Sequence, residues 1–437
     1  MNEKKSLENT INQFLSDTGE FEPLVQKGIV EKIDADLRKV YFKEVLKARK
    51  DTKIKNKLVD IIFDEYKSEL SHEKALRKKQ AKWVVEELVG TGIIGMIIEA
   101  NADITDIGWN GTHLALETND EKIIVKGEKL GIDHTYVERV IQKYARANDK
   151  EFNESLPRLD GMIGNVRLNA IHRVLSPDGA TLSLRVTRPL LALSGENFEA
   201  FAPIEILELL ELIVKTNANI FISGETGSGK TELQKLLLSF VNEREKIVMI
   251  EDVRETHAKT LFEDKDIYSW ITGKNTSITD LTSASLRNNP KWIIISETRG
   301  KEAYEMMQAI LSGHHVVTTL HATDALAIPR RFVNMCASGY DVNEQMLLSD
   351  FLRYVDFGIH IERQEINGKV VRYLSELVEF SNDETQYIFR QTYNGITKKF
   401  EYEYGKISVA FLKRMQRKGL TFEFKEGVND GESKVKA

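Results

Sequence analysis

The sequence has little cysteine, little proline and no long hydrophobic run. Its 437 residues include one cysteine, Cys336, and seven prolines. One cysteine cannot form a disulfide framework or a multi-cysteine zinc site, and it suits a reducing compartment. The longest apolar-looking run, residues 88–100, is interrupted by glycines and Glu99, and it is shorter than the roughly 20 residues that a membrane-spanning helix needs. The first residues lack the apolar core of a signal peptide. We therefore expect no membrane-spanning segment.

The composition is that of an ordinary globular protein. Hydrophobic residues make up 41% and charged residues 29% of the chain, whose length allows two or three domains, each with its own core. The net charge of −6 excludes a polycation that coats nucleic acid. Charge is unevenly distributed, because residues 36–85 hold 15 Lys/Arg against 8 Asp/Glu. This stretch is either a set of solvated helix faces or a docking surface for an anionic membrane or an acidic partner.

Changes in pattern along the chain predict its organisation. The first 80 or so residues contain almost no Gly or Pro and repeat apolar residues at helical spacing, as in Val40, Phe42, Val45 and Leu46, which predicts three or so helices. The predicted segments are a helical N-terminal extension (1–82), a mixed α+β domain (83–190), a linker (191–202), an α/β domain (203–425) and a disordered polar tail (426–437).

The α/β domain is predicted from short apolar strands that alternate with helical stretches. These strands are NIFIS (219–223), KIVMI (246–250), WIIIS (292–296) and HVVTTL (315–320). Continuous apolar strands separated by helices indicate a parallel sheet covered on both faces. Two later segments, 354–362 and 370–380, are predicted as additional strands at the edge of that sheet.

A glycine-rich segment follows the first of these strands. Its sequence, GETGSGKT at 224–231, fits the pattern G-x-x-x-x-G-K-[ST], and the helical stretch TELQKLLLSF follows it. Glycines let the backbone curl so that several N–H groups meet one phosphate group. We therefore predict a nucleotide-binding P-loop in which Lys230 reaches the β and γ phosphates and Thr231 ligates Mg²⁺. The predicted nucleotide-binding residues are Gly224, Glu225, Thr226, Gly227, Ser228, Gly229, Lys230 and Thr231.

Two of the predicted strands end in carboxylates. Glu251 follows KIVMI, and Glu297 follows WIIIS. The carboxyl ends of parallel strands are where ligands collect. A single carboxylate there is equally well a helix N-cap, but two in one P-loop domain favour a role in holding the Mg²⁺ shell or orienting the attacking water.

A further strand carries histidines at or near both ends. The segment GHHVVTTLHA (313–322) contains His314 and His321. A lone histidine is more often a structural residue than a participant in chemistry. A neutral His321 beside the threonines at the end of the strand could, however, sense a γ-phosphate.

Taken in order, these pieces resemble the traffic ATPases of type II and type IV secretion, type IV pilus and conjugation machines. GETGSGKT matches their P-loop, VMIEDVRE their Asp box, IIISETRG their Walker B segment and GHHVVTTLHA their His box. Ser296 stands where the family usually has glycine. Upstream segments also match, so the resemblance spans about residues 85–380. It implies a RecA-like P-loop domain and ATP hydrolysis with Mg²⁺.

The resemblance also implies roles for individual residues. Glu251 corresponds to the carboxylate that polarises the attacking water, and Glu297 to the one that supports Mg²⁺ through water. His321, and also His314, correspond to sensors of the γ-phosphate. Arg167 and Arg185 fall where the family places arginines that face the nucleotide, although arginines alternating on a strand are also common as surface charges. Arg173 is a weaker candidate.

The family also provides expectations about assembly. The resemblance implies a cytoplasmic homohexameric ring at the inner face of the cell membrane. The expected partners are platform or channel proteins, with a coupling ATPase as a further candidate. No sequence-specific binding of nucleic acid is expected. The single cysteine excludes the four-cysteine zinc module of many extension ATPases, and the helical extension looks closer to the CpaF-like branch. Two rivals stay open: a nucleic-acid-pulling RecA-like enzyme such as a helicase, and a scaffold that binds nucleotide without turnover.

Overall fold

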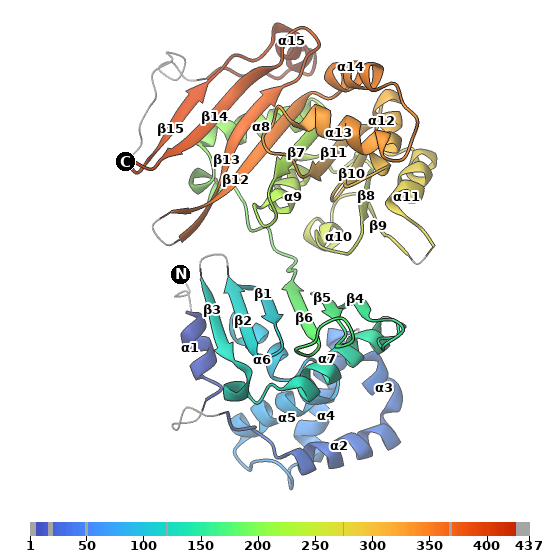
Figure 1. Cartoon of the computed structure of the whole chain (residues 1–437), viewed down its shortest axis with the longest axis vertical. Helices are drawn as coiled ribbons and strands as arrows, with labels where there is room; N and C mark the ends of the chain where they lie inside the picture. The colour runs from blue at the N-terminus through green and yellow to red at the C-terminus, as the bar shows by residue number, and fades with distance from the viewer. Residues whose placement is uncertain are drawn as a thin grey trace. The chain divides into compact units, whose positions relative to one another are not determined.

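The chain forms two compact units, Met1–Thr187 and Arg188–Ala437, drawn in Figure 1. The computed structural model describes residues 6–15, 21–48, 51–118, 121–273, 275–366 and 369–424. The predicted disordered tail, 426–437, lies outside the described residues. Among the described helices, none has the length and apolar character that a membrane span requires.

The first unit combines a helical part with an antiparallel sheet. Its helices are α1 (Leu7–Asn12), α2 (Lys27–Val40), α3 (Phe42–Lys47), α4 (Thr52–Glu65), α5 (Lys74–Leu88), α6 (Ile93–Ala100) and α7 (His134–Ala147). Its strands are β1 (Ile104–Trp109), β2 (His113–Thr118), β3 (Lys122–Lys126), β4 (Arg158–Ile163), β5 (Val166–Ile171) and β6 (Thr181–Val186), in the order β3-β2-β1-β6-β5-β4. We call this the small sheet.

Two cores stabilise the first unit. One lies between helices α2 to α5, and the other packs α6 and α7 against the small sheet. The sequence pattern at α2 and α3 was misleading, because α2 ends at Val40 and α3 starts at Phe42, with Tyr41 between them in a non-helical conformation. This break changes the helical register. Val45 is therefore buried, whereas Val40, Phe42 and Leu46 are exposed.

The second unit is built on one mixed sheet, which we call the large sheet. Its strands are β7 (Ile220–Gly224), β8 (Ile247–Glu251), β9 (Ile267–Ile271), β10 (Trp292–Ile295), β11 (His315–Leu320), β12 (Phe357–Ile366), β13 (Lys369–Glu379), β14 (Gln386–Asn394) and β15 (Lys399–Tyr404). The order is β15-β14-β13-β12-β7-β11-β10-β8-β9. Neighbours from β12 to β9 are parallel, and those from β12 to β15 are antiparallel.

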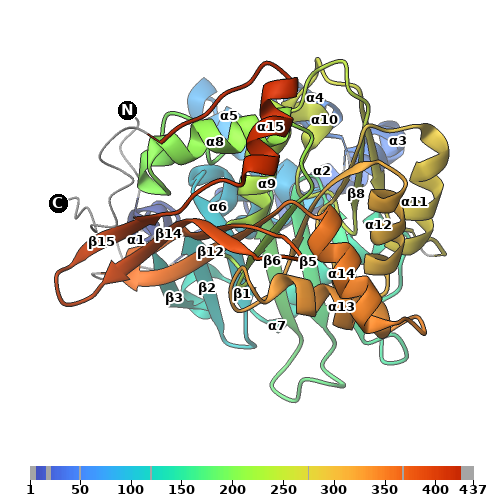
Figure 2. The same ribbon diagram turned by 90° about the horizontal axis from the view of Figure 1, so that it is seen from above.

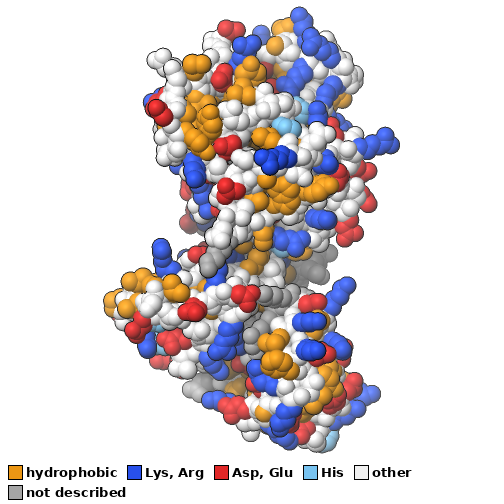
Figure 3. Space-filling view, turned by 90° about the vertical axis from the view of Figure 1, so that its right-hand side faces the viewer, with side chains coloured by type: hydrophobic (Ala, Val, Ile, Leu, Met, Phe, Trp, Pro, Cys, Tyr) orange, Lys and Arg blue, Asp and Glu red, His pale blue; other side chains and the backbone are white. Residues whose placement is uncertain are grey.

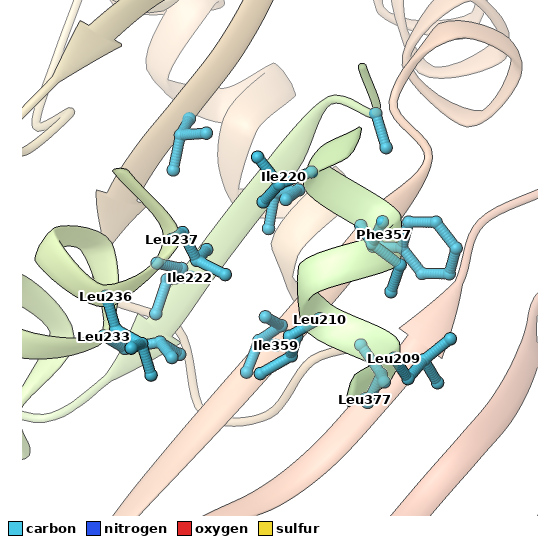
Figure 4. Packing of buried hydrophobic residues seen from close by; sticks show 14 of the residues in the cluster. Leu209, Leu210, Ile220, Ile222, Leu233, Leu236, Leu237, Phe357, Ile359 and Leu377 are labelled. Atoms are coloured by element: carbon cyan, nitrogen blue, oxygen red, sulfur yellow. The ribbon is translucent and has the colours of Figure 1, made fainter. Parts of the chain in front are cut away.

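Helices cover both faces of the large sheet. They are α8 (Ile204–Lys215), α9 (Lys230–Phe240), α10 (Ala258–Leu261), α11 (Ile278–Ser285), α12 (Glu302–Leu311), α13 (Ile328–Ala337), α14 (Glu344–Tyr354) and α15 (Val409–Arg417). Figure 2 shows α8 and α15 over one side of the sheet. Alternate residues of a strand enter different cores: Ile220 and Ile222 pack with α8 and α9 (Figure 4), and Phe221 packs with α13 and α14. The central parallel strands are therefore buried on both faces and rich in apolar residues.

The predicted fold class, a RecA-like α/β domain preceded by a mixed α+β domain and a helical region, is confirmed. The prediction that segments 354–362 and 370–380 lie at the edge of the sheet is wrong. They form much of β12 and β13, and β12 pairs with both β7 and β13, so β15 is the edge strand on that side. Strand β9 was not predicted from the sequence; it is the last strand on the other side of the sheet, where Ile267 is buried and Tyr268 and Ile271 are exposed.

Candidate nucleotide site at the carboxyl edge of the large sheet

The P-loop connects the end of β7 to the start of α9. Gly224, Gly227 and Gly229 all have positive φ, at 151°, 75° and 100°. At Gly224 an added Cβ would lie 2.5 Å from the carbonyl oxygen of Ile361 and 2.6 Å from Oγ of Ser228. No side chain fits in that space, so the loop requires glycine there. Gly229 is the N-cap of α9, which begins at Lys230, so the backbone N–H groups at the start of the helix are available to an anion.

Lys230 lies folded against this loop. Its Nζ donates hydrogen bonds to the carbonyl oxygens of Gly224 at 2.8 Å and Glu225 at 2.9 Å. Burial lowers the pKa of Lys230 to about 8, and the charge of Glu297 opposes this shift. A buried ammonium with this reduced preference for its charge is stabilised by a multiply charged anion. The lysine therefore suits a phosphate ligand.

The strands next to β7 bring three further side chains to the same edge. The order β7-β11-β10-β8 places the P-loop, His321, Glu297 and Glu251 side by side, each at or directly after the end of its parallel strand. We call this edge, where the parallel strands end, the carboxyl edge. The sheet order thus brings together residues that are up to 97 positions apart in the sequence.

Glu297 is the centre of a charged cluster. Its Oε1 lies 3.1 Å from Nε2 of His321, and its Oε2 accepts a hydrogen bond from Nη2 of Arg299 at 2.7 Å. Nδ1 of His321 lies 3.4 Å from Nζ of Lys230. Burial raises the pKa of Glu297, but the hydrogen bond and charge of Arg299, with His321 and Lys230, outweigh it and leave the pKa below its ordinary value. The carboxylate is therefore ionised at neutral pH.

Glu251 is fully buried, and one of its two carboxylate oxygens has hydrogen-bond partners among the described residues. Its Oε1 accepts hydrogen bonds from the backbone N–H groups of Glu255 at 3.0 Å and Thr256 at 2.9 Å. Its Oε2 is buried and has no hydrogen-bond partner among the described residues. Burial raises the pKa of Glu251, and the two backbone hydrogen bonds oppose the shift. A buried polar atom without a partner needs an explanation, and a bound water or ligand would supply one.

The P-loop contains a second buried polar atom of this kind. Oγ of Ser228 is buried and, in the part of the chain that the structure describes, has no hydrogen-bond partner. Thr231 is half-buried on the first turn of α9. The Thr231 hydroxyl and the ionised Glu297 carboxylate are hard oxygen donors, the ligand type that Mg²⁺ prefers. The residues present therefore fit a magnesium–nucleotide ligand.

His314 is not brought to this edge. It precedes β11, at the opposite end of the strand from His321, and its Nδ1 lies 2.8 Å from the carbonyl oxygen of Pro290. A strand of six residues separates the two ends by about 20 Å. The position of His314 contradicts the expectation that it contacts the nucleotide. The sequence could have separated the two histidines, because His314 precedes the predicted strand and His321 follows it, and ligands collect at the carboxyl ends of parallel strands.

The predicted arginines lie in the first unit. Arg167 on β5 and Arg185 on β6 are directly opposite each other in the small sheet, and Nε of Arg185 lies 3.0 Å from Oδ1 of Asp106 on β1. Arg173 lies in the loop after β5 and is exposed. Arg167 and Arg185 therefore form one row of charge, and their contact with a nucleotide stays a prediction.

Two arginines that were not predicted from the sequence lie at the P-loop. Nε of Arg372 on β13 donates a hydrogen bond to the carbonyl oxygen of Gly227 at 2.8 Å, and the side chain of Arg363 on β12 runs past the same glycine. A signal existed, because the dipeptide Asn367-Gly368 between two apolar runs favours a hairpin. The pairing of that hairpin's strand with β7 could not be read from the sequence.

Comparison with known proteins gives the family. Residues 159–355 match the family model described as "Type II/IV secretion system protein". An uncharacterized protein of Bacillus anthracis is 48% identical over 352 residues, which cover 78% of this chain and 79% of that protein.

Two relatives carry names that refer to transport. A Mycobacterium tuberculosis (strain CDC 1551 / Oshkosh) protein named for conjugal transfer is 27% identical over 295 residues, covering 63% of this chain and 81% of its own. The type IV secretion system protein PtlH of Bordetella pertussis is 36% identical over 171 residues, covering 37% of this chain and 50% of its own. The chain belongs to the family of type II/IV secretion system proteins, the traffic ATPases whose motifs it carries in order.

Proposed function

We propose that this chain hydrolyses ATP to power a secretion, conjugation or type IV pilus-like machine. The main support for the proposal is the set of groups along the carboxyl edge of the large sheet. The glycine-rich loop and the buried Lys230 follow β7, and His321, Glu297 and Glu251 lie at the ends of the next three strands in the sheet order. The names of the two relatives, one for conjugal transfer and one for type IV secretion, support the choice of machine.

In this mechanism the loop binds the triphosphate. Backbone N–H groups around Gly227 and Gly229 face the phosphates, and Lys230 gives up its two carbonyl contacts to meet their charge. Ser228 completes the loop with its buried hydroxyl. Thr231, and Glu297 through water, would hold Mg²⁺, which would supply positive charge beside the phosphates. His321 exchanges its contact with Glu297 for a hydrogen bond that it donates to the terminal phosphate.

Glu251 orients and polarises the attacking water. Its Oε1 is held by two backbone N–H groups, so the carboxylate cannot rotate freely, and the unpartnered Oε2 is the atom that accepts a hydrogen bond from water. The raised pKa of Glu251 makes this carboxylate a better proton acceptor than an exposed one. Arg167 and Arg185 stabilise the developing charge from the first unit, across the subunit boundary of a homohexameric ring.

We also propose that the ring works at the inner face of the cell membrane and that α2 and α3 contact anionic lipid. Phe42 and Leu46 are four residues apart on α3, as are Lys43 and Lys47, and all four are exposed. An apolar row thus runs beside a basic row. Val40, 72% exposed, adds to the apolar row. Figure 3 shows hydrophobic side chains interspersed with Lys and Arg on one face of the first unit.

Binding to vesicles tests the membrane proposal. The double variant Val40→Ser/Phe42→Ser should lose about tenfold in affinity for phosphatidylglycerol vesicles, measured by co-sedimentation, and neither protein should bind phosphatidylcholine. Ile396→Ser, at an apolar residue that is 94% exposed in the second unit, is the matched control. Equal binding by the double variant and the wild type would remove α2 and α3 from the proposal.

Turnover by a Lys230→Ala variant tests the activity. Without the ammonium the phosphates lose their buried counter-charge, and phosphate release by the full chain should fall to background, a loss of about 1,000-fold or more. Lys215→Ala is the control, since Lys215 is exposed on α8 and pairs with Glu211. Near-normal phosphate release by Lys230→Ala would refute the proposed function.

A further inference from the structure

The strands β12 and β13 continue past the carboxyl edge of the large sheet. Pairing between β12 and β7 runs from Phe357 to Ile361, and its last pair is Ile361 with Gly224, the first residue of the P-loop. Strand β12 then extends to Ile366, paired only with β13. Figure 1 shows the two strands as a long ribbon. The part of the ribbon beyond Ile361 therefore lies beside the P-loop.

Two arginines face the loop from this ribbon. Arg363 and Arg372 are direct cross-strand partners. Besides the hydrogen bond from Arg372 to the Gly227 carbonyl, a Cβ added to Gly227 would lie 4.0 Å from Cδ and Nε of Arg363, and one added to Gly229 would lie 3.7 Å from Cδ of Arg372. Like charges directly opposite each other destabilise a strand pair. The position of these two arginines beside a P-loop therefore indicates that they bind an anionic ligand.

The opposite face of the ribbon is anchored, so the arginines are not simply mobile surface side chains. Tyr373 is 1% exposed, and its ring packs edge-on against Phe400 with centroids 4.9 Å apart. Its hydroxyl donates to Glu362 and lies 3.3 Å from Oε1 of Gln364. On the arginine face, Glu365 lies two residues beyond Arg363, opposite Val370. The face is therefore positive beside the loop and mixed toward the tip.

The side on which the arginines lie indicates which phosphates they meet. Strand β7 lies between β11 and β12. His321, Glu297 and Glu251 follow strands on the β11 side, so the bond that is cleaved must lie on that side. The ribbon flanks the loop on the β12 side, where the remainder of a nucleotide held by the loop would extend.

We propose that Arg363 and Arg372 bind the phosphates nearest the nucleoside in the nucleotide of their own protomer, and so set affinity and not the rate of cleavage. This inference rests on the proposed function. Arg372 also fixes the loop through the Gly227 carbonyl, so it both binds and positions. Both contacts are charge-assisted and form with ADP as well as with ATP.

The test compares Arg363→Gln and Arg372→Gln in the full chain. The affinity for N-methylanthraniloyl-ADP is measured directly, and the affinities for ATP and ADP are measured by competition with this probe. All three affinities should weaken by about tenfold for Arg372→Gln and about threefold for Arg363→Gln, equally for ATP and ADP. Turnover at saturating ATP should fall by a smaller factor than affinity does in each variant. Arg390→Gln is the matched control, because Arg390 lies on β14 and pairs with Glu403 at 3.2 Å.

A salt series separates binding from a structural role. Gln keeps an N–H donor for the Gly227 carbonyl but has no charge, so the dependence of ADP affinity on ionic strength should become shallower in both variants, and Arg372→Lys should restore most of the affinity. Unchanged ADP affinity, an unchanged salt dependence, or a loss of turnover at saturating ATP with affinity intact would each overturn the inference. If the wild type does not bind the ADP probe, the proposed function fails together with this inference. If the wild type binds the probe and both arginine variants bind it with the same affinity, only this inference fails.

Discussion

The two edges of the large sheet are built from similar buried polar residues but use them differently. At the carboxyl edge, Oγ of Ser228 and Oε2 of Glu251 are buried without a partner among the described residues. At the amino edge, where the parallel strands begin, the polar groups bond to one another. The backbone N–H of Asn219 donates to Asp356 at 2.7 Å, and Asp356 also accepts from Arg414.

The same contrast holds for the other side chains of the amino edge. Nε1 of Trp292 donates to Glu245 at 2.7 Å, and Arg414 also donates to the Thr216 carbonyl at 3.3 Å. Burial lowers the pKa of His315 to about 3, so this histidine stays neutral. Satisfied polar groups fix the starts of the strands. At the carboxyl edge, the atoms of Ser228 and Glu251 that have no partner among the described residues can still bind a ligand, and this difference distinguishes the two edges.

Among the variants that compare the two edges, the largest effect on turnover is expected from Glu251→Gln. Gln keeps the acceptor for the two backbone N–H groups but cannot take a proton, so turnover should fall about 1,000-fold, about 4 kcal/mol in the barrier, with ADP affinity unchanged. Steady-state phosphate release and ADP titration measure the two. Glu245→Gln is the matched change at the amino edge and should leave turnover intact. Parallel loss of ADP affinity in Glu251→Gln would contradict the water-polarising role.

Breaking the amino edge should give the opposite result. Arg414→Met leaves the Asp356 carboxylate buried without its counter-charge, and burial already raises the pKa of Asp356 against the influence of Arg414. The free energy of unfolding should fall by about 3 kcal/mol, measured by urea denaturation of the full chain. Turnover by the protein that remains folded should be unchanged. A turnover defect with normal stability would show that this edge participates in the reaction.

Alanine variants of His321 and His314 compare the two edges again, with a smaller expected loss of turnover. His321→Ala removes a neighbour of Lys230 and Glu297, and turnover should fall about 30-fold, about 2 kcal/mol in the barrier. His314→Ala removes only the contact with the Pro290 carbonyl and should cost about 1 kcal/mol of stability. Both are measured by phosphate release and thermal unfolding. Similar turnover losses in both variants would restore His314 to the site.

The parallel strands and the loop were predictable because their causes are local. Strands β7, β8, β10 and β11 are rich in apolar residues and almost entirely buried, and they lie within two residues of the predicted ranges. β9 was not predicted, since this last strand of the sheet is only partly buried and Ser269 interrupts its apolar residues. The exposure of Phe42 and Leu46 was also missed, because a single non-helical residue, Tyr41, shifts the register of the following helix.

What the sequence determined by itself is the chemistry: which residues form the phosphate loop, and that carboxylates and a histidine end the neighbouring strands. The order of the strands was decided only by the tertiary structure. That order makes Glu297 and His321 neighbours of Lys230 and brings Arg363 and Arg372 against the loop. Pairing between strands depends on contacts between residues far apart in the chain, and no local pattern specifies which strand β7 takes as its neighbour.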